Sequence, residues 1–217
     1  MPRLIVPGFP HHITQRGVRS IDIFRDDEAR RTYLDFLSEE ADRSGVHFLS
    51  WCLMTNHVHF VAIPSKPESL ARAFGEAHRR YTRMRNFQDG VRGYLFQGRF
   101  GSCVLDENHL IAAARYVERN PVKAGIVAHA GAYEWSSARF HLGMVETDLL
   151  VSDRNLLGTV SDWQDLLLSE DEGDSERLRL LTRTGRPAGD EIFVETVESV
   201  TGRDPRPRKP GRPRKQK

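Results

Sequence analysis

The chain has 217 residues, of which 39% are hydrophobic, and it carries a formal net charge of +2. This length allows one domain with a substantial core and an appendage, and the low hydrophobic fraction indicates that part of the chain does not pack. No run approaches the roughly 18 apolar residues of a membrane span, and the opening MPRLIVPGFPHH lacks the apolar stretch of a signal peptide, so we expect a soluble, cytoplasmic protein with no membrane partner.

The charges are segregated along the chain. Residues 146–177 hold ten Asp and Glu against two Arg, whereas residues 203–217 hold eight Lys and Arg against one Asp. A basic tail behind an acidic segment is typical of an arm that binds a polyanion, although such a tail can also serve only solubility or non-specific contact. We therefore expect a folded domain over residues 1–145, an acidic, partly helical extension that packs loosely over residues 146–202, and a disordered basic tail over residues 203–217.

Strand-like and helix-like patterns alternate over the first domain. Short apolar or alternating runs indicate strands, and apolar residues at intervals of three and four indicate helices. Capping residues mark the helix ends: Asp106 precedes the last helix, and Pro121 is expected to halt it. The predicted elements, in chain order, are a strand over residues 11–17, a helix over 27–44, strands over 46–54 and 57–63, a helix over 68–86, a strand over 94–105 and a helix over 107–120.

This order of elements predicts an α+β, ferredoxin-like split βαβ fold. In that fold two helices pack on one face of a four-stranded antiparallel sheet, and the helix over residues 107–120 is left to cover the other face. Because side chains alternate along a strand, Val58 and Phe60 can face the two packing helices while His57 and His59 share the opposite face. Two imidazoles side by side can hold a metal, but the pattern alone fits surface or hydrogen-bonded histidines equally well.

The last predicted helix carries Tyr116 and Asn120 four residues apart, on one helical face. A helix over the free face of the sheet would bring this phenol and this amide toward the two histidines. The alternative is that Tyr116 is a half-buried core residue and Asn120 only ends the helix. A metal-dependent hydrolase is disfavoured, because it would need a carboxylate base near the metal and Glu118 points elsewhere.

Five segments between residues 2 and 143 occur in a characteristic order, namely GFPHHITQRG, CLMTNHVHFV, LFQGRF, RYVERNPVKAGIV and WSSARFHLG. Together they resemble the HUH single-strand transposases, and within them the REP-associated tyrosine transposases with an IS200-like transposase domain. The resemblance implies that the first domain is catalytic, that His57, His59 and Asn120 bind Mg²⁺ or Mn²⁺, and that Tyr116 is the nucleophile.

The implied activity is metal-dependent cleavage and strand transfer of single-stranded DNA beside palindromic, REP-like hairpins, through a covalent phosphotyrosine. A phenol with a pKa of about 10 is a weak nucleophile at neutral pH, so the phosphate must be polarised and held in line. The resemblance also implies a monomer that associates with the nucleoid. A second hypothesis is a regulator derived from a transposase, which recognises hairpins but does not cut them.

Arginines are the candidate DNA contacts. Those in the first domain can follow a phosphate backbone, although each can equally be a solvated charge. The tail sequence GRPRK resembles an AT-hook, which would insert into the minor groove of A·T-rich duplex DNA, and a plain cationic tail is the alternative. The candidate contacts are Arg16, Arg72, Arg79, Arg80, Arg83, Arg99, Arg212 and Arg214.

Overall fold

The computed structural model describes residues 3–154, 160, 162–169 and 172–206. At its centre is a four-stranded sheet of β1 (His11–Arg16), β2 (Val46–Leu53), β3 (His57–Pro64) and β4 (Gly101–Val104). The strand order is β2-β3-β1-β4, and every neighbouring pair is antiparallel. The prediction of an α+β, ferredoxin-like split βαβ fold is therefore confirmed.

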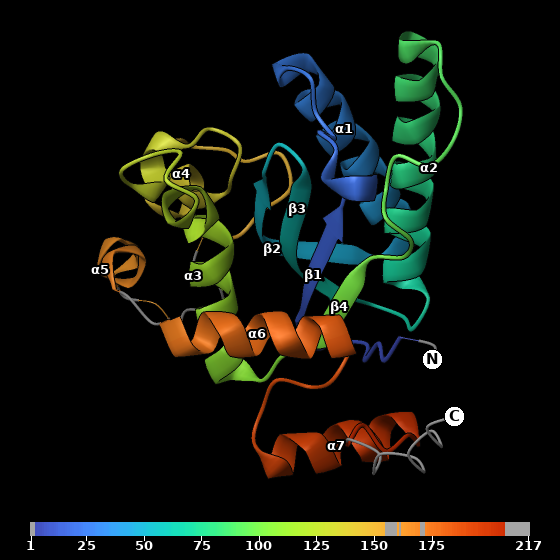
Figure 1. The fold of residues 1–217 in the computed structure, drawn as a ribbon. Coiled ribbons are helices and arrows are strands. Elements are labelled where there is room, and N and C mark those ends of the chain that lie inside the picture. The colour runs from blue at the N-terminus through green and yellow to red at the C-terminus, as the bar shows by residue number, and fades with distance from the viewer. Residues whose placement is uncertain (1–2, 155–159, 161, 170–171, 207–217) are drawn as a thin grey trace, which may run out of the picture.

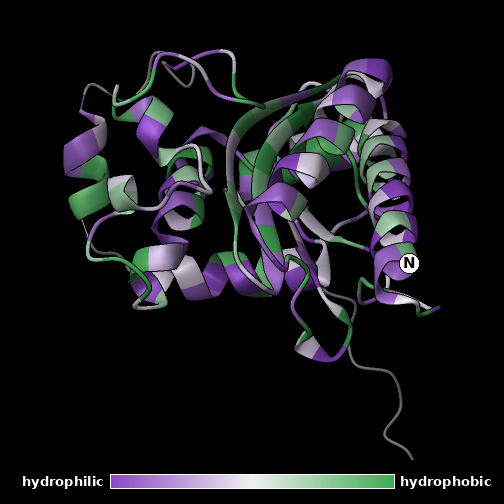
Figure 2. Ribbon diagram, turned by 90° about the horizontal axis from the view of Figure 1, so that it is seen from above, coloured by the Kyte–Doolittle hydropathy of each residue, from purple (hydrophilic) through white to green (hydrophobic). Residues whose placement is uncertain are grey.

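Helices cover both faces of this sheet (Figure 1). α1 (Asp27–Ser44) and α2 (Ser69–Asp89) lie together on one face, and α3 (Glu107–Lys123) lies on the other, as the view from above also shows (Figure 2). Val58 and Phe60 of β3 are fully buried, and the Phe60 ring lies 5.2 Å from that of Phe74 in α2. The predicted apolar side of β3 thus faces the α1 and α2 layer, which leaves its histidines for the α3 side.

Helix α3 continues past the point where the sequence predicts its end. Pro121 lies inside the helix, and Ala124 N donates to Asn120 O at 2.9 Å beyond it. Proline removes one intrahelical donor, but its fixed φ suits a helix, so the last turn still forms. The chain then leaves through Gly125, whose φ of +68° favours glycine. The prediction that Pro121 halts the helix was wrong by about one turn.

Strand β4 is shorter than predicted. The apolar pattern predicts a strand over residues 94–105, whereas only Gly101–Val104 is a strand. Gly93 and Gly98 have φ angles of +122° and +62°, which interrupt an extended backbone. The segment from Val91 to Phe100 is consequently a loop, attached to the end of β1 by an isolated bridge between Gly17 and Phe96.

The C-terminal extension packs on the first domain more closely than expected. Its helices α5 (Trp163–Leu168) and α6 (Glu172–Thr184) lie on the α3 side, and α7 (Glu191–Thr201) lies beyond α6 (Figure 1). Trp163 of α5 and Leu178 of α6 are buried in the same hydrophobic core as the sheet, and Val197 of α7 packs with Leu4 and Val6 in a smaller cluster. Burial of such large apolar side chains stabilises the attachment of these helices. The remaining helices are η1 (Val18–Ser20), η2 (Ala130–Ala132) and α4 (Ala138–His141). Within the described ranges, no helix combines the length and apolar content that crossing a bilayer requires.

Candidate active site

The two histidines of β3 lie on the sheet face that α3 covers. The ring centroids of His57 and His59 are 5.1 Å apart, at an interplanar angle of 85°. His59 is buried and His57 is partly exposed. The sequence-based prediction that these imidazoles share one face is confirmed, and the pair adjoins both the protein interior and solvent.

Helix α3 brings Tyr116 to this pair. The centroid of its ring lies 5.4 Å from that of His59, and the planes are perpendicular. Asn120 is buried one turn further along, where its Nδ2 donates to the carbonyl oxygen of Tyr116 at 2.8 Å. That bond uses the nitrogen end of the amide, so Oδ1 is the end that could act as a ligand.

Burial keeps both β3 histidines uncharged. Burial, together with the positive charges of Arg16 and Arg179, lowers the pKa of His57 to about 4. Burial also holds the pKa of His59 well below its ordinary value, with His12 the next cause. Neutral imidazoles keep a lone pair at neutral pH, which is the state that binds a metal.

A third imidazole, His12 of β1, belongs to the site and was not predicted. Its Nε2 lies 3.1 Å from His59 Nδ1, and its Nδ1 lies 2.7 Å from Thr182 Oγ1 of α6. Burial lowers the pKa of His12 to about 3. The alternation of His12, Thr14 and Arg16 along β1 was visible in the sequence, but only the pairing of Thr14 with His59 places these residues on the histidine face.

The extension also reaches the proposed nucleophile. Arg179 of α6 donates from Nε to the hydroxyl oxygen of Tyr116 at 2.9 Å, and its guanidinium carbon lies 5.5 Å from the centroid of the Tyr116 ring. A guanidinium in this position stabilises negative charge that develops on the phenol oxygen. No local pattern around residue 179 indicated this role.

Glu118 faces away from the histidines, as predicted. Its side chain is fully buried and accepts hydrogen bonds from Ser137 Oγ at 2.5 Å, His141 Nδ1 at 2.6 Å and Trp163 Nε1 at 2.7 Å. This carboxylate therefore fixes α3 to α4 and α5, and it is not placed to serve as a base near the histidine pair.

The donors at the site suit a weakly held divalent ion. Among the described residues, no three or more His, Cys, Asp or Glu side chains are grouped as a metal site would require. His57, His59 and the amide oxygen of Asn120 would therefore need further oxygen ligands. Phosphate and water supply such ligands to Mg²⁺ and Mn²⁺, so the donor set fits a metal that is completed by DNA.

The arginines predicted on α2 have different surroundings. Arg80 turns toward α1, where it pairs with Glu39 and Glu40 at 2.8 Å in both cases, which favours the structural alternative for this residue. Arg72 and Arg79 are exposed and pair within α2, with Glu68 at 3.9 Å and Glu76 at 2.5 Å respectively.

The other predicted arginines lie elsewhere in the fold or beyond it. Arg16 is exposed at the end of β1, directly opposite His57 in the sheet. Arg83 and Arg99 are exposed in the groove described next. Arg212 and Arg214 lie outside the described residues, so the AT-hook stays a prediction.

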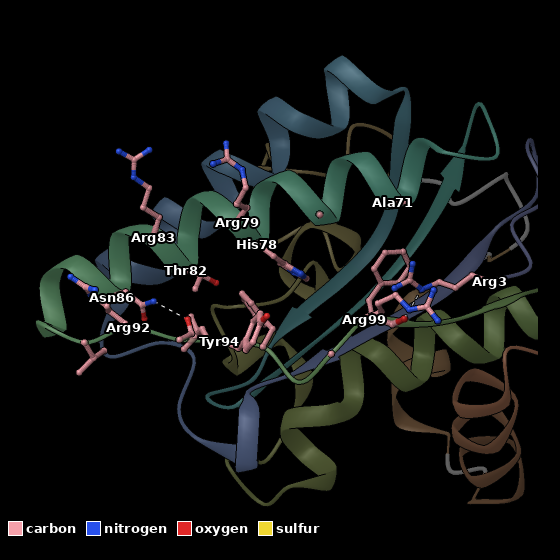
Figure 3. A pocket seen from close by; sticks show the side chains of 17 residues that line it. Arg3, Ala71, His78, Arg79, Thr82, Arg83, Asn86, Arg92, Tyr94 and Arg99 are labelled. Atoms are coloured by element: carbon pink, nitrogen blue, oxygen red, sulfur yellow. Dashed lines mark hydrogen bonds between the residues drawn. The ribbon is translucent and has the colours of Figure 1, made fainter. Parts of the chain in front are cut away.

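A basic groove of about 730 Å³ runs between α2 and the loop from Val91 to Phe100 (Figure 3). Arg92 lies at one end of the groove and Arg3 and Arg99 at the other. The Arg3 guanidinium stacks 3.7 Å above the Phe100 ring. Burial and the neighbouring Arg99 lower the pKa of Arg3 to about 10. Two cations that repel each other in this way favour the binding of an anion.

The fold and the site together define a class of protein, in which a tyrosine on a helix faces a histidine pair on a central strand of a ferredoxin-like sheet. Residues 9–120, just over half of the chain, match the family model described as "Transposase IS200 like". The chain belongs to this family of DNA-processing transposases. The resemblance inferred from the sequence motifs is thereby confirmed.

Two solved structures are similar to this chain. A REP-associated tyrosine transposase bound to a REP hairpin has 13% sequence identity and a TM-score of 0.53, over 70% of this chain and 90% of that one. A protein described as a transposase from Deinococcus radiodurans R1 has 18% identity and a TM-score of 0.40, over 55% of this chain and 95% of that one. The first likeness shows the shared fold. A search of curated protein sequences gives no match.

Proposed function

We propose that this transposase cleaves and rejoins single-stranded DNA beside hairpins, with Tyr116 as the nucleophile and Mg²⁺ or Mn²⁺ held by His57, His59 and Asn120. The observation that carries the proposal is the 5.4 Å separation between the ring centroids of Tyr116 and His59. A nucleophile and a metal-binding pair must address the same phosphate, and positioning of this kind supplies much of the catalysis in phosphoryl transfer.

The protein side chains have separable tasks in this reaction. A divalent metal, when bound, would polarise the scissile phosphate and neutralise the charge that develops on it. Tyr116 would attack the phosphorus, so that a phenol O–P bond forms and the P–O bond to the adjoining nucleotide breaks. The phenol gives its proton to solvent, and the leaving oxygen takes one from solvent and so becomes a hydroxyl. Arg179, which donates to the phenol oxygen at 2.9 Å, would stabilise that oxygen as its negative charge grows.

The phosphotyrosine retains the energy of the broken bond, so attack by a DNA hydroxyl at the same phosphorus can rejoin strands without ATP. In the family that the sequence resembles, the tyrosine takes the 5′ phosphate and frees a 3′ hydroxyl. This polarity is the one that we propose here.

We propose that the groove between α2 and the 91–100 loop binds the DNA. Arg83 and Arg99 line it with exposed guanidinium groups, and Tyr94, which is 89% exposed, offers a ring for base stacking. Arg3 and Arg99 together would bind a backbone phosphate. The REP hairpin bound by the similar transposase supports a hairpin as the ligand.

The decisive experiment incubates the full chain with hairpin-bearing single-stranded DNA and Mn²⁺ and detects a protein–DNA adduct that resists SDS. Tyr116→Phe should abolish the adduct and leave hairpin binding nearly unchanged, because only a hydroxyl is lost. Tyr94→Phe, which removes the same group from an exposed loop residue, should retain the adduct. Excess EDTA, His57→Ala and His59→Ala should each prevent cleavage.

The outcomes separate the two hypotheses. An adduct of normal yield from Tyr116→Phe would refute the nucleophile assignment. Tight hairpin binding by the unmodified chain, without any adduct, would instead favour the regulator that recognises hairpins and does not cut them.

A further inference from the structure

We infer that Thr182 and His12 are positioning residues that fix the tautomer of His59, so that His59 presents Nε2, and not Nδ1, to the metal. The inference rests on the proposed metal-dependent function and goes beyond it, because it assigns a role to a residue of the C-terminal extension. The chain of hydrogen bonds that carries it runs from the Leu178 carbonyl through Thr182 and His12 to His59.

The direction of this chain is set at its α6 end. Thr182 Oγ1 lies 2.8 Å from the carbonyl oxygen of Leu178, to which it donates. A carbonyl oxygen has no proton to give, so the single hydroxyl proton of Thr182 is committed to this bond. The oxygen of Thr182 is then an acceptor toward its two other neighbours, His12 Nδ1 at 2.7 Å and Cys103 Sγ at 3.3 Å.

Because the Thr182 oxygen is an acceptor, the tautomers of both His12 and His59 follow. His12 must carry its proton on Nδ1, and because a neutral imidazole has only one N–H, its Nε2 must accept. The partner of His12 Nε2 is His59 Nδ1 at 3.1 Å, which therefore donates. His59 is left with an unprotonated Nε2, and that is the nitrogen able to ligate.

His57 reaches the same tautomer by a shorter route. Its Nδ1 lies 2.7 Å from Asn56 Oδ1, and the other end of that amide, Nδ2, donates to Ser20 O at 3.3 Å. An amide oxygen only accepts, so His57 Nδ1 carries the proton and Nε2 the lone pair. Both histidines of the pair therefore keep Nε2 unprotonated. In metal sites, the groups that accept from the other ring nitrogen usually fix the tautomer of a ligating histidine in this way.

Burial protects the hydrogen bonds that link Thr182, His12 and His59 from water. Thr182 is 2% exposed, His12 1% and His59 6%. Water therefore does not replace the hydroxyl of Thr182 without a rearrangement of α6 against the sheet. Without that hydroxyl, no acceptor would fix which ring nitrogen of His12, and in turn of His59, carries the proton.

The tautomers can be read directly in the metal-free protein. Nitrogen-15 spectra of the imidazole side chains distinguish Nδ1–H from Nε2–H, and we expect His12, His57 and His59 all as the Nδ1–H form. Thr182→Val, which keeps the size of the side chain and removes its acceptor, should convert His12 and His59 to mixed tautomers. An Nε2–H form of His12 or His59 in the unmodified protein would overturn the inference.

Mn²⁺ affinity, measured by titration calorimetry without DNA, provides a second test. Thr182→Val should weaken binding by about 10-fold, the lower end of the effect of losing a direct partner of a metal-binding histidine, because Thr182 acts on His59 through His12. Thr182→Ser retains the hydroxyl and should restore the affinity. Thr184→Val is the matched control, because Thr184 lies on the same helix and its hydroxyl donates to the backbone carbonyls of Leu180 at 2.9 Å and Leu181 at 3.1 Å.

Unchanged Mn²⁺ affinity in a folded Thr182→Val variant would also overturn the inference. Failure of the proposed function has a different signature, namely that the unmodified protein forms no SDS-resistant adduct with hairpin DNA and Mn²⁺. In that case the imidazole spectra would still decide whether Thr182 and His12 set the tautomer of His59.

Discussion

Replacement of Trp163 by Phe tests whether the acidic extension is an integral part of the fold. The Trp163 indole donates to Oε2 of Glu118 at 2.7 Å, whereas the other donors to this carboxylate, Ser137 and His141, bond to Oε1. Phenylalanine keeps most of the apolar bulk and removes the N–H. The carboxylate of Glu118, which is fully buried, would then lose the only donor to Oε2 among the described residues.

A hydrogen bond to a buried charged group is worth about 1.5–3 kcal/mol. At an m value of about 3 kcal/mol per molar urea, this loss lowers the midpoint of unfolding by about 0.5–1 M. Circular dichroism at increasing urea measures the shift. Trp135→Phe is the control, because Trp135 and Trp163 are each 8% exposed and the Trp135 indole nitrogen has no hydrogen-bond partner among the described residues.

The difference between the two variants isolates the hydrogen bond from the change in side-chain size. If Trp163→Phe lowers the midpoint no more than Trp135→Phe does, the indole bond to Glu118 contributes nothing net. The extension would then be held by apolar packing and by its other hydrogen bonds, such as that from Arg179 to the Tyr116 hydroxyl.

Three further predictions concern acid stability and DNA binding. Burial lowers the pKa of His78 from 6.5 to about 3, so the unfolded chain takes up a proton that the folded chain does not, and stability falls as the pH drops below about 6.5. His78→Gln should remove up to about 1.4 kcal/mol per pH unit of that fall. Equal slopes of stability against pH for the variant and the unmodified protein, in urea unfolding between pH 5 and 6, would contradict the assignment. Arg83→Gln should weaken hairpin binding and reduce the dependence of log affinity on log salt concentration by about 1. Arg80→Gln changes an arginine on the same helix that pairs with α1, and it should leave this slope unchanged. If the two variants change the slope equally, the groove is excluded as the DNA site. Residues 207–217 hold six Lys and Arg. If about five of them meet phosphates, deletion of this segment should make the slope of log affinity for duplex DNA against log salt concentration shallower by roughly 4. Hairpin cleavage should survive the deletion, and an unaltered slope would refute a DNA-binding arm.

Features that depend on near neighbours in the chain were predicted correctly from the sequence. Alternation along β3 separates His57 and His59 from Val58 and Phe60, and the spacing of four on α3 places Tyr116 and Asn120 on one side. The order of strands and helices was sufficient to predict the sheet. Two predictions of element ends were wrong. Pro121 does not halt α3, because it removes only one hydrogen-bond donor, and β4 is shorter than its apolar pattern predicts, because glycines with positive φ interrupt the extended backbone.

The side chains that complete the site come from segments that are remote from one another in the sequence. His12 lies beside His59 because of the register between β1 and β3, and Thr182 contacts His12 across 170 positions of sequence. Arg179 reaches the Tyr116 hydroxyl from the same helix. A hydrogen bond requires its donor and acceptor within about 3 Å, and that distance between remote segments is set by how α6 docks on the sheet, which no periodicity along the chain records.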